Sequence, residues 1–206
     1  MPKFPYWKVP KIWPGEDVFI LGGGPSLLDN DLSLIHNRKV IGVNDAYRLG
    51  TWVDVCWFGD WEWFRMHRKE LAKFPGLIAT HQQQCKHMKS VKVLQFREEG
   101  ICDDPLYVAR NRNSGGSAVN LAYHLGAKRI ILLGFDMHLE TGTKRSNWHD
   151  DNRCSPTEHS YGVMLNCFKK IAEDAVQLGL TIINATPESS LTLFPFQTLK
   201  EVTSDD

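Results

Sequence analysis

Short apolar runs recur along the chain, separated by segments in which apolar residues repeat every three or four positions. Runs of this kind are typical of buried strands, because the strands of a covered parallel sheet are apolar on both faces. The runs span residues 18–21, 39–43, 53–58, 77–80, 91–96, 129–133 and 180–184. They predict a mainly parallel sheet of about six to seven strands.

Two of the intervening segments have a clear helical period. Apolar residues recur at steps of three and four from Met164 to Leu178, which predicts one helix ending at Gly179. The same pattern predicts a second helix over residues 118–125, ending at Gly126. Strands that alternate with amphipathic helices indicate an α/β fold with helices on both faces of the sheet.

The chain therefore divides into three parts of unequal size. Residues 17–200 are expected to form a single Rossmann-like, nucleotide-binding domain. Residues 1–16 are rich in proline and aromatic residues, and we expect an irregular arm packed across this domain. The polar stretch 140–158 has no periodicity and reads as a lid-like loop.

Composition and charge narrow the classes of function. Lys and Arg together number 24, as do Asp and Glu, so the formal net charge is zero and no global field favours nucleic acid or an anionic membrane. Nucleic acid is not excluded, since a local basic groove leaves the net charge unchanged. The five cysteines include no close pair, which favours reduced thiols. No apolar stretch approaches the roughly 20 residues of a membrane span. We expect a cytoplasmic protein. Whether it forms a homo-oligomer is left open by the sequence.

Candidate chemistry begins where the first apolar run ends in glycines. Gly22, Gly23 and Gly24 let the backbone approach a ligand and adopt positive φ, and Pro25 opens the next helix. The free N–H groups of that first turn, with Ser26, would face a phosphate. The spacing differs from the dinucleotide motif G-x-G-x-x-G and from the P-loop. The alternative is a tight turn without a ligand.

Polar residues also follow the next two runs. Asn44 offers a donor and an acceptor to a base or ribose, and Asp45 follows it. Asp60 suits a Mg²⁺ ion or a substrate hydroxyl, which makes it the candidate metal ligand. Alternatively, each of these residues caps the helix that follows.

Two further polar segments complete the predicted site. Asn113, Ser114 and Gly115 precede a predicted helix and resemble a second cradle for an anion or a sugar. The run 129–133 leads into Phe135, Asp136 and Met137, and a carboxylate at that strand end suits substrate contacts, metal binding or proton transfer.

Histidines supply the remaining candidates. His159 follows the lid-like loop at the start of a long helix, where it could act as a general base or simply be solvated. A zinc site built from His149, Cys154 and His159 has a weaker basis, because the spacing matches no common zinc pattern; the same holds for His81, Cys85 and His87. An aromatic cluster around Trp63 has three equal interpretations: it is part of the core, it contacts another copy of the chain, or it forms a platform for the acceptor.

These same residues carry a resemblance over residues 17–195. The blocks are 18–27, 43–47, 113–136 and 158–160 with 184–187, in this order. The chain resembles the superfamily that joins bacterial CMP-sialic-acid-dependent sialyltransferases, Maf-type flagellin glycosyltransferases and archaeal 6-hydroxymethylpterin diphosphokinases. Small phage proteins share the pattern.

The resemblance implies roles for particular residues. The glycine turn at 22–26, Asn44 and the Ser114-Gly115 pair would hold the phosphate and sugar of a nucleotide. His159 falls where sialyltransferases keep the histidine that deprotonates the acceptor hydroxyl. Met137 and His138 stand where those enzymes have aromatic residues, and Asp60 has no clear counterpart there.

The leading hypothesis is a glycosyltransferase that uses a nucleotide-activated, CMP-linked sugar, a histidine base and no obligatory metal or cofactor. One alternative is a diphosphokinase of the hydroxymethylpterin type, with Asp60 and Asp136 on Mg²⁺. Others are a non-catalytic nucleotide-binding or scaffold protein and a DNA-modifying glycosyltransferase. The expected partner is a nucleotide or nucleotide sugar, and the sequence does not name the acceptor.

Overall fold

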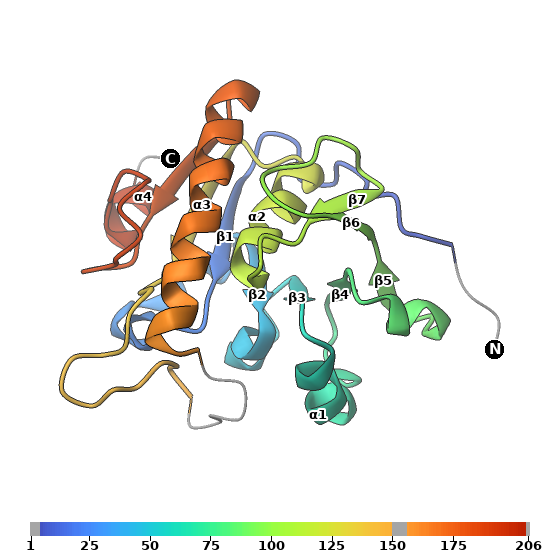
Figure 1. Cartoon of the computed structure of the whole chain (residues 1–206), viewed down its shortest axis with the longest axis horizontal. Coiled ribbons are helices and arrows are strands. Elements are labelled where there is room, and N and C mark those ends of the chain that lie inside the picture. Colours follow the sequence, from blue (N-terminus) through green and yellow to red (C-terminus); the bar gives the residue numbers. More distant parts are fainter. Residues whose placement is uncertain (1–4, 150–155, 205–206) are drawn as a thin grey trace.

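The computed structural model describes residues 5–149 and 156–204 (Figure 1). The main sheet contains β1 (Asp17–Leu21), β2 (Lys39–Val43), β3 (Val55–Phe58), β4 (Leu77–Thr80), β5 (Val91–Val93), β8 (Arg129–Leu133) and β9 (Thr181–Asn184). A separate pair is formed by β6 (Gln95–Arg97) and β7 (Tyr107–Ala109). The α-helices are α1 (Trp61–Leu71), α2 (Ser114–Leu125), α3 (Glu158–Leu178) and α4 (Leu199–Ser204). Short 3-10 helices are η1 (Pro25–Asp29), η2 (Leu32–Ile35), η3 (Asn44–Leu49) and η4 (Gln83–His87).

The main sheet has the order β5-β4-β3-β2-β1-β8-β9, and every neighbouring pair is parallel. From β1 the chain adds strands outward to β5 (Figure 1), then crosses to the other side of β1 with β8 and β9. The order reverses between β1 and β8, which is where ligands gather in sheets of this kind, outside the carboxyl ends of the strands. The predicted single α/β domain of Rossmann type is confirmed.

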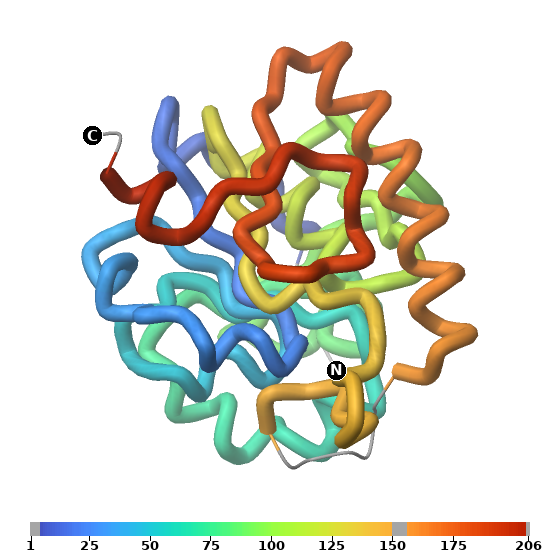
Figure 2. The backbone as a smooth tube through the Cα atoms, turned by 90° about the vertical axis from the view of Figure 1, so that its left-hand side faces the viewer, coloured from blue at the N-terminus to red at the C-terminus, as the bar shows by residue number. Residues whose placement is uncertain are grey.

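Both faces of the sheet are buried, as the continuous apolar strands require. Val18 and Ile20 of β1 face a core closed by α2 and α3, whereas Phe19 and Leu21 face the opposite core. That second core is closed by η1, η2, η3 and α4. Figure 2 shows α3 on one side of the molecule and the short turns of residues 25–49 on the other. On this second face, short turns replace the long helices of a regular βαβ unit.

Two predicted boundaries are wrong, and both errors have local causes. The run 91–96 is not one strand, because the N–H of buried Leu94 donates to Thr80 (2.9 Å), whereas that of Gln95 donates to Leu106 (2.9 Å). The chain thus leaves the main sheet and pairs with β7, which is too short to give a hydrophobic pattern. Helix α2 begins at Ser114, four residues before the predicted start.

The predicted helix ends are confirmed. Gly126 follows α2 with φ 106° and Gly179 follows α3 with φ 64°, both left-handed conformations that favour glycine. At its start, α3 has a capping box between Thr157 and Ser160. The start and end of α3 are therefore both set by local sequence.

Two irregular segments pack against this frame. Residues 5–16 contain no helix or strand; the N–H of Trp13 donates to Leu125 (2.8 Å), and the Trp13 side chain is buried. Residues 140–149 form turns, residues 150–155 lie outside the described part, and Glu158 already belongs to α3. None of the helices in the described ranges has the length and apolar character needed to cross a membrane.

Candidate functional site

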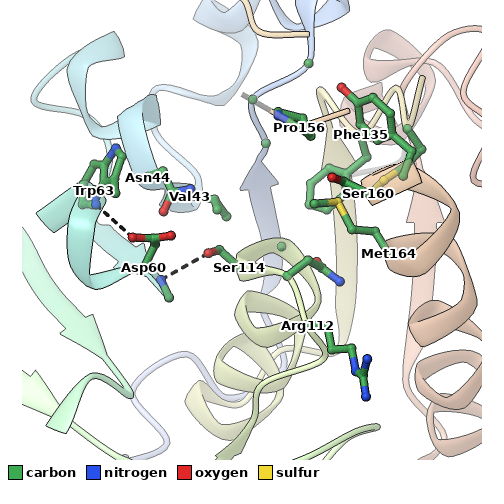
Figure 3. Close-up of a pocket in the computed structure, with 18 of the residues that line it drawn as sticks. Val43, Asn44, Asp60, Trp63, Arg112, Ser114, Phe135, Pro156, Ser160 and Met164 are labelled. Atoms are coloured by element: carbon green, nitrogen blue, oxygen red, sulfur yellow. Dashed lines mark hydrogen bonds between the residues drawn. The ribbon is translucent and has the colours of Figure 1, made fainter. Parts of the chain in front are cut away.

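A cavity of about 770 Å³ opens at the carboxyl ends of β1, β2, β3 and β8 (Figure 3). It collects most of the predicted site residues: Gly22, Gly23, Gly24, Asn44, Asp60, Asn113, Ser114, Gly115, Phe135, Asp136 and Met137. In Figure 3, Asn44, Asp60 and Trp63 lie on one wall, and Pro156, Ser160 and Met164 lie on the opposite one. Pro25, Ser26, Asp45 and His159 do not line the cavity.

The glycines after β1 are required for close packing, and the predicted positive φ is wrong for all three. A Cβ on Gly22 would lie 2.4 Å from the carbonyl oxygen of Gly134, and one on Gly24 would lie 1.7 Å from Oδ2 of Asp136. Neither distance is compatible with a side chain. The turn after β1 is thus pressed against the turn after β8, and the two form one floor of the cavity.

Asp136 ties these two turns together. Its Oδ1 accepts from the backbone N–H of Ser26 (3.1 Å) and its Oδ2 from the Ser26 hydroxyl (2.9 Å). Burial raises the pKa of Asp136, and the Ser26 hydrogen bonds oppose that rise. The predicted phosphate cradle in the first turn of η1 is wrong in this respect: Pro25 has no N–H, and that of Ser26 is occupied by Asp136.

Asn44, directly after β2, has an unsatisfied polar atom. Its backbone has φ 51°, a conformation that asparagine tolerates better than most residues. Its side-chain Oδ1 is buried and forms no hydrogen bond with any described residue. A buried acceptor without a partner costs about 1–3 kcal/mol. Because this oxygen is shielded from solvent, a donor group on a ligand reaches it only if the Asn44 side chain turns toward the cavity that the residue lines.

Asp60, after β3, caps a helix, as one of the two alternatives foresaw. Its Oδ1 accepts from the N–H of Trp63 in the first turn of α1 (2.9 Å), while the residue itself is exposed. Beside it, the N–H of Gly59 donates to the hydroxyl of Ser114 (3.1 Å). No group of three His, Cys, Asp or Glu residues suited to a metal occurs in residues 5–149 and 156–204.

The N-terminus of α2 opens directly into the cavity. Asn113 caps the helix, accepting from the N–H of Gly116 (2.6 Å). The N–H groups of Ser114 and Gly115 donate to no described residue. Free amides at a helix N-terminus favour an anion. Gly115 is required because a Cβ there would lie 2.6 Å from the ring of Phe135.

Asp45 points away from the cavity into a buried polar cluster. Its Oδ2 accepts from the indole N–H of Trp63 (2.6 Å), and its Oδ1 lies 3.6 Å from Nδ1 of His67. Nε2 of His149 lies 3.6 Å from Oδ2 on another side. Asp45 therefore links η3, α1 and the loop at 140–149.

That loop forms part of the cavity wall. The N–H of Trp148 donates to the carbonyl of Gly23 (2.9 Å), and Ser146 and Asn147 line the cavity. Tyr161 lines the facing wall, and burial raises the pKa of its hydroxyl to about 12. The hydroxyl thus stays protonated at neutral pH, and it donates a long hydrogen bond to the carbonyl oxygen of Ser146 (3.4 Å).

His159 lies in the first turn of α3 with an exposed side chain. Ser160, Tyr161 and Met164 of the same helix line the cavity, and the helical period of about 3.6 residues turns His159 away from the face that they share. Cys154, part of the weaker zinc hypothesis, lies outside the described residues. Around Trp63 the aromatic cluster belongs largely to the core, with Trp57, Trp63 and Phe64 all buried.

Sequence reasoning considered His81 only in the weaker zinc hypothesis, and it missed Arg110 and Arg112, which also line the cavity. His81 follows β4, so the strand-end argument that found Asn44 and Asp60 would also have found it. Arg110 and Arg112 precede the cap of α2, and two arginines just before a glycine-rich helix start are a usable signal for an anion site. His81 is 8% exposed, and burial, with Arg110 nearby, lowers its pKa to about 4.

Comparison with known proteins gives a likeness of fold. The chain is similar to two structures of the sialyltransferase CstII from Campylobacter jejuni. One, in complex with cytidine-5'-monophosphate, has a TM-score of 0.59 and 15% identity, covering 90% of this chain and 86% of that one. The other, with CMP-3FNeuAc, has a TM-score of 0.54 and 16% identity, covering 89% and 86%. No protein-family model matches the chain, and no curated protein matches its sequence. The protein thus has a sialyltransferase-like fold.

Proposed function

We propose that the cavity binds a nucleotide-activated sugar and that the protein is a glycosyltransferase with a CMP-linked donor. The observation that carries the proposal is a convergence: the glycine turn after β1, Asn44 after β2 and the N-terminus of α2 line one cavity. The likeness in fold to a sialyltransferase solved with cytidine ligands supports the choice of nucleotide. At about 770 Å³ the cavity has the size of a small-molecule site.

The nucleoside end of the donor suits the wall around Asn44. The buried Oδ1 of Asn44 lacks a donor among the described residues, and cytosine offers an exocyclic amino group while ribose offers hydroxyls. Once the Asn44 side chain turns toward the cavity, a hydrogen bond from the ligand to Oδ1 contributes to affinity without replacing an internal one.

The phosphate suits the N-terminus of α2. The free amides of Ser114 and Gly115 give partial positive charge there. Arg112 also lines the cavity, but its 68% exposed side chain points away from Ser114 in Figure 3 and lies 3.9 Å from Glu99, so it must turn to reach a phosphate. Gly22, Gly23 and Gly24 keep the opposite floor free of side chains. The Tyr161 hydroxyl becomes a further donor to the leaving phosphate if it gives up its long hydrogen bond to the Ser146 carbonyl (3.4 Å).

Two parts of the mechanism stay predictions. His159 as the base that deprotonates the acceptor hydroxyl rests on the sequence resemblance, because its exposed side chain does not line the cavity and α3 would have to shift or turn to bring it there. A Mg²⁺-dependent diphosphokinase has no specific observation in its favour, because Asp60 caps α1 and both oxygens of Asp136 accept from Ser26.

A thermal-shift screen separates these functions. We expect stabilisation by CMP and CMP-sugars without added metal; at 100 times the dissociation constant a ligand adds about 2.7 kcal/mol. UDP-sugars, ATP and GTP, each with and without Mg²⁺, serve as the comparison. Stabilisation by ATP only in the presence of Mg²⁺ would overturn the proposal in favour of the diphosphokinase. No response to any nucleotide would favour a scaffold protein.

A further inference from the structure

A second hollow of about 630 Å³ adjoins the donor cavity. It lies over η4, beyond the carboxyl end of β4, and is completed by Phe96 and Arg110. The two hollows share His81, Gln82 and Arg110. The two hollows are therefore adjacent, with these three side chains at the boundary between them.

The charges of the two hollows differ. The donor cavity is lined by acids as well as bases, among them Asp60, Glu98 and Asp136. The second hollow is lined by Lys86, His87 and Arg110, and no Asp or Glu is found among its described lining residues. Because the net charge of the chain is zero, this cationic lining is a local feature. Arg110 is paired with Glu98, whereas the Lys86 ammonium lies 3.5 Å from the centroid of the Tyr6 ring and has no acid partner among the described residues. Lys86 therefore supplies the excess positive charge that favours an anionic ligand.

The guanidinium of Arg110 is fixed by two contacts, and some of its N–H groups have no acceptor among the described residues. One terminal nitrogen, Nη2, donates to both oxygens of Glu98 (2.6 and 2.7 Å), and the guanidinium stacks over the ring of Phe96 at 4.2 Å. No described residue accepts from Nη1 or Nε of Arg110. A fixed guanidinium with free N–H groups is suited to a carboxylate or a phosphate.

His81 stands at the junction of the two hollows. Its ring packs between Trp57 and Phe96, with centroid distances of 5.9 and 6.0 Å. Neither ring nitrogen forms a hydrogen bond with a described residue. With its pKa lowered to about 4, the imidazole is neutral near pH 7 and has one nitrogen able to accept a hydrogen bond from a hydroxyl.

We propose that the second hollow is the acceptor subsite and that it takes a hydroxyl-bearing anion, a sugar phosphate or a sugar acid. Lys86 and Arg110 bind the anionic group, and His81 orients the hydroxyl toward the donor cavity. Arg110 covers one face of the Phe96 ring, and the rest of this side chain, which is 37% exposed, offers an apolar contact to the sugar ring. This inference rests on the proposed glycosyltransferase function.

The test compares three probes of the same ring size: glucose 6-phosphate, glucuronate and neutral glucose. Binding is followed by NMR on the imidazole signals of His81 and His87, in the presence of saturating CMP. We expect saturable shifts with one or both anions and none with glucose; which anion binds distinguishes phosphate from carboxylate.

Lys86→Gln should weaken that binding about tenfold. Lys89→Gln, an exposed lysine outside the lining, makes the same charge change and should have no effect.

The two proposals fail in different ways. If CMP binds but neither anion shifts the His81 signal, or if Lys86→Gln and Lys89→Gln bind the anions alike, the acceptor subsite is wrong and the donor site stands. If CMP itself does not bind to the wild-type protein, the proposed function is wrong. The CMP affinity of Lys86→Gln should equal that of the wild type, because Lys86 does not line the donor cavity.

Discussion

The carboxylate of Asp136 accepts two hydrogen bonds from Ser26, at 3.1 Å from the backbone N–H and 2.9 Å from the hydroxyl. The two residues are 110 positions apart in sequence and belong to the turns that follow β1 and β8. Their pairing fixes the floor of the cavity at the point where the strand order reverses. With both oxygens occupied, Asp136 is best understood as a positioning residue of the glycine turn.

The tight contact between these turns predicts a specific steric effect. In Gly24→Ala the new Cβ would lie 1.7 Å from Oδ2 of Asp136, so the turns must separate and the Ser26 hydrogen bonds must weaken. We expect the free energy of unfolding in urea to fall by about 2–3 kcal/mol. The control is Gly162→Ala in α3, where no atom lies within 4 Å and stability should rise by about 0.5–1 kcal/mol. Equal effects of both substitutions would contradict the close contact.

The raised pKa of Asp136 predicts an unusual pH dependence. Burial makes the folded state bind this proton more tightly than the unfolded chain does, so the stabilising contribution is present below the ordinary pKa of 3.8 and is lost as the pH rises through the folded value. Asp136→Asn removes the charge and keeps the shape. The variant should therefore gain stability relative to the wild type between about pH 4 and pH 7 in urea titrations. A constant difference across that range would show that the pKa is not raised.

The lowered pKa of His81 predicts a pH dependence of stability that is opposite in sign to that of Asp136. Its pKa falls from 6.5 to about 4 on folding, so its contribution to stability is complete above pH 6.5 and is lost as the pH falls toward 4. The loss amounts to about 3 kcal/mol at most. His81→Gln should flatten the stability profile in that interval, with His36→Gln, an exposed histidine, as the control. An NMR titration midpoint for His81 close to 6.5 would contradict the assignment.

A substitution of Asn44 should weaken ligand binding while leaving the stability of the fold nearly unchanged. Asn44→Gly keeps the left-handed backbone, which has φ 51°, and removes the unpartnered amide. We expect a change of less than about 1 kcal/mol in the free energy of unfolding. CMP affinity, measured by isothermal titration calorimetry, should fall at least about tenfold. Glu188→Gly, also at positive φ (55°) but outside the cavity lining, should bind CMP normally. Normal binding by Asn44→Gly would remove Asn44 from the donor site.

The sequence predicted the parts of this protein that depend on local periodicity. The strands from β1 to β4, β8 and β9 follow from their apolar runs, and the ends of α2 and α3 follow from Gly126 and Gly179. The strand-end rule also brought Gly22, Asn44 and Asp136 together correctly, because parallel strands share one carboxyl edge.

The remaining features depend on contacts between distant residues. Asp45 and Asn44 are adjacent in sequence, yet one faces Trp63 and the other the cavity, since η3 turns the two side chains apart. The 3-10 helix η1 cannot hold a phosphate on the N–H of Ser26 because Asp136, far along the chain, already occupies it. No local pattern contains this information. The second hollow likewise depends on β6 and β7, whose three-residue strands give too short a signal.

His159 carries the last prediction, because its proposed role as base can be tested separately from folding and donor binding. The side chain is exposed in the first turn of α3 and does not line the cavity, so His159→Ala should leave stability and CMP affinity unchanged. If His159 deprotonates the acceptor hydroxyl, turnover of the donor should fall about 100- to 10,000-fold, and the fall should appear in kcat. His36→Ala, another exposed histidine distant in sequence, is the control for a general effect of the substitution. Unchanged turnover in His159→Ala, with CMP still bound, would exclude His159 and direct the search for the base to residues that line the cavity, His81 first among them.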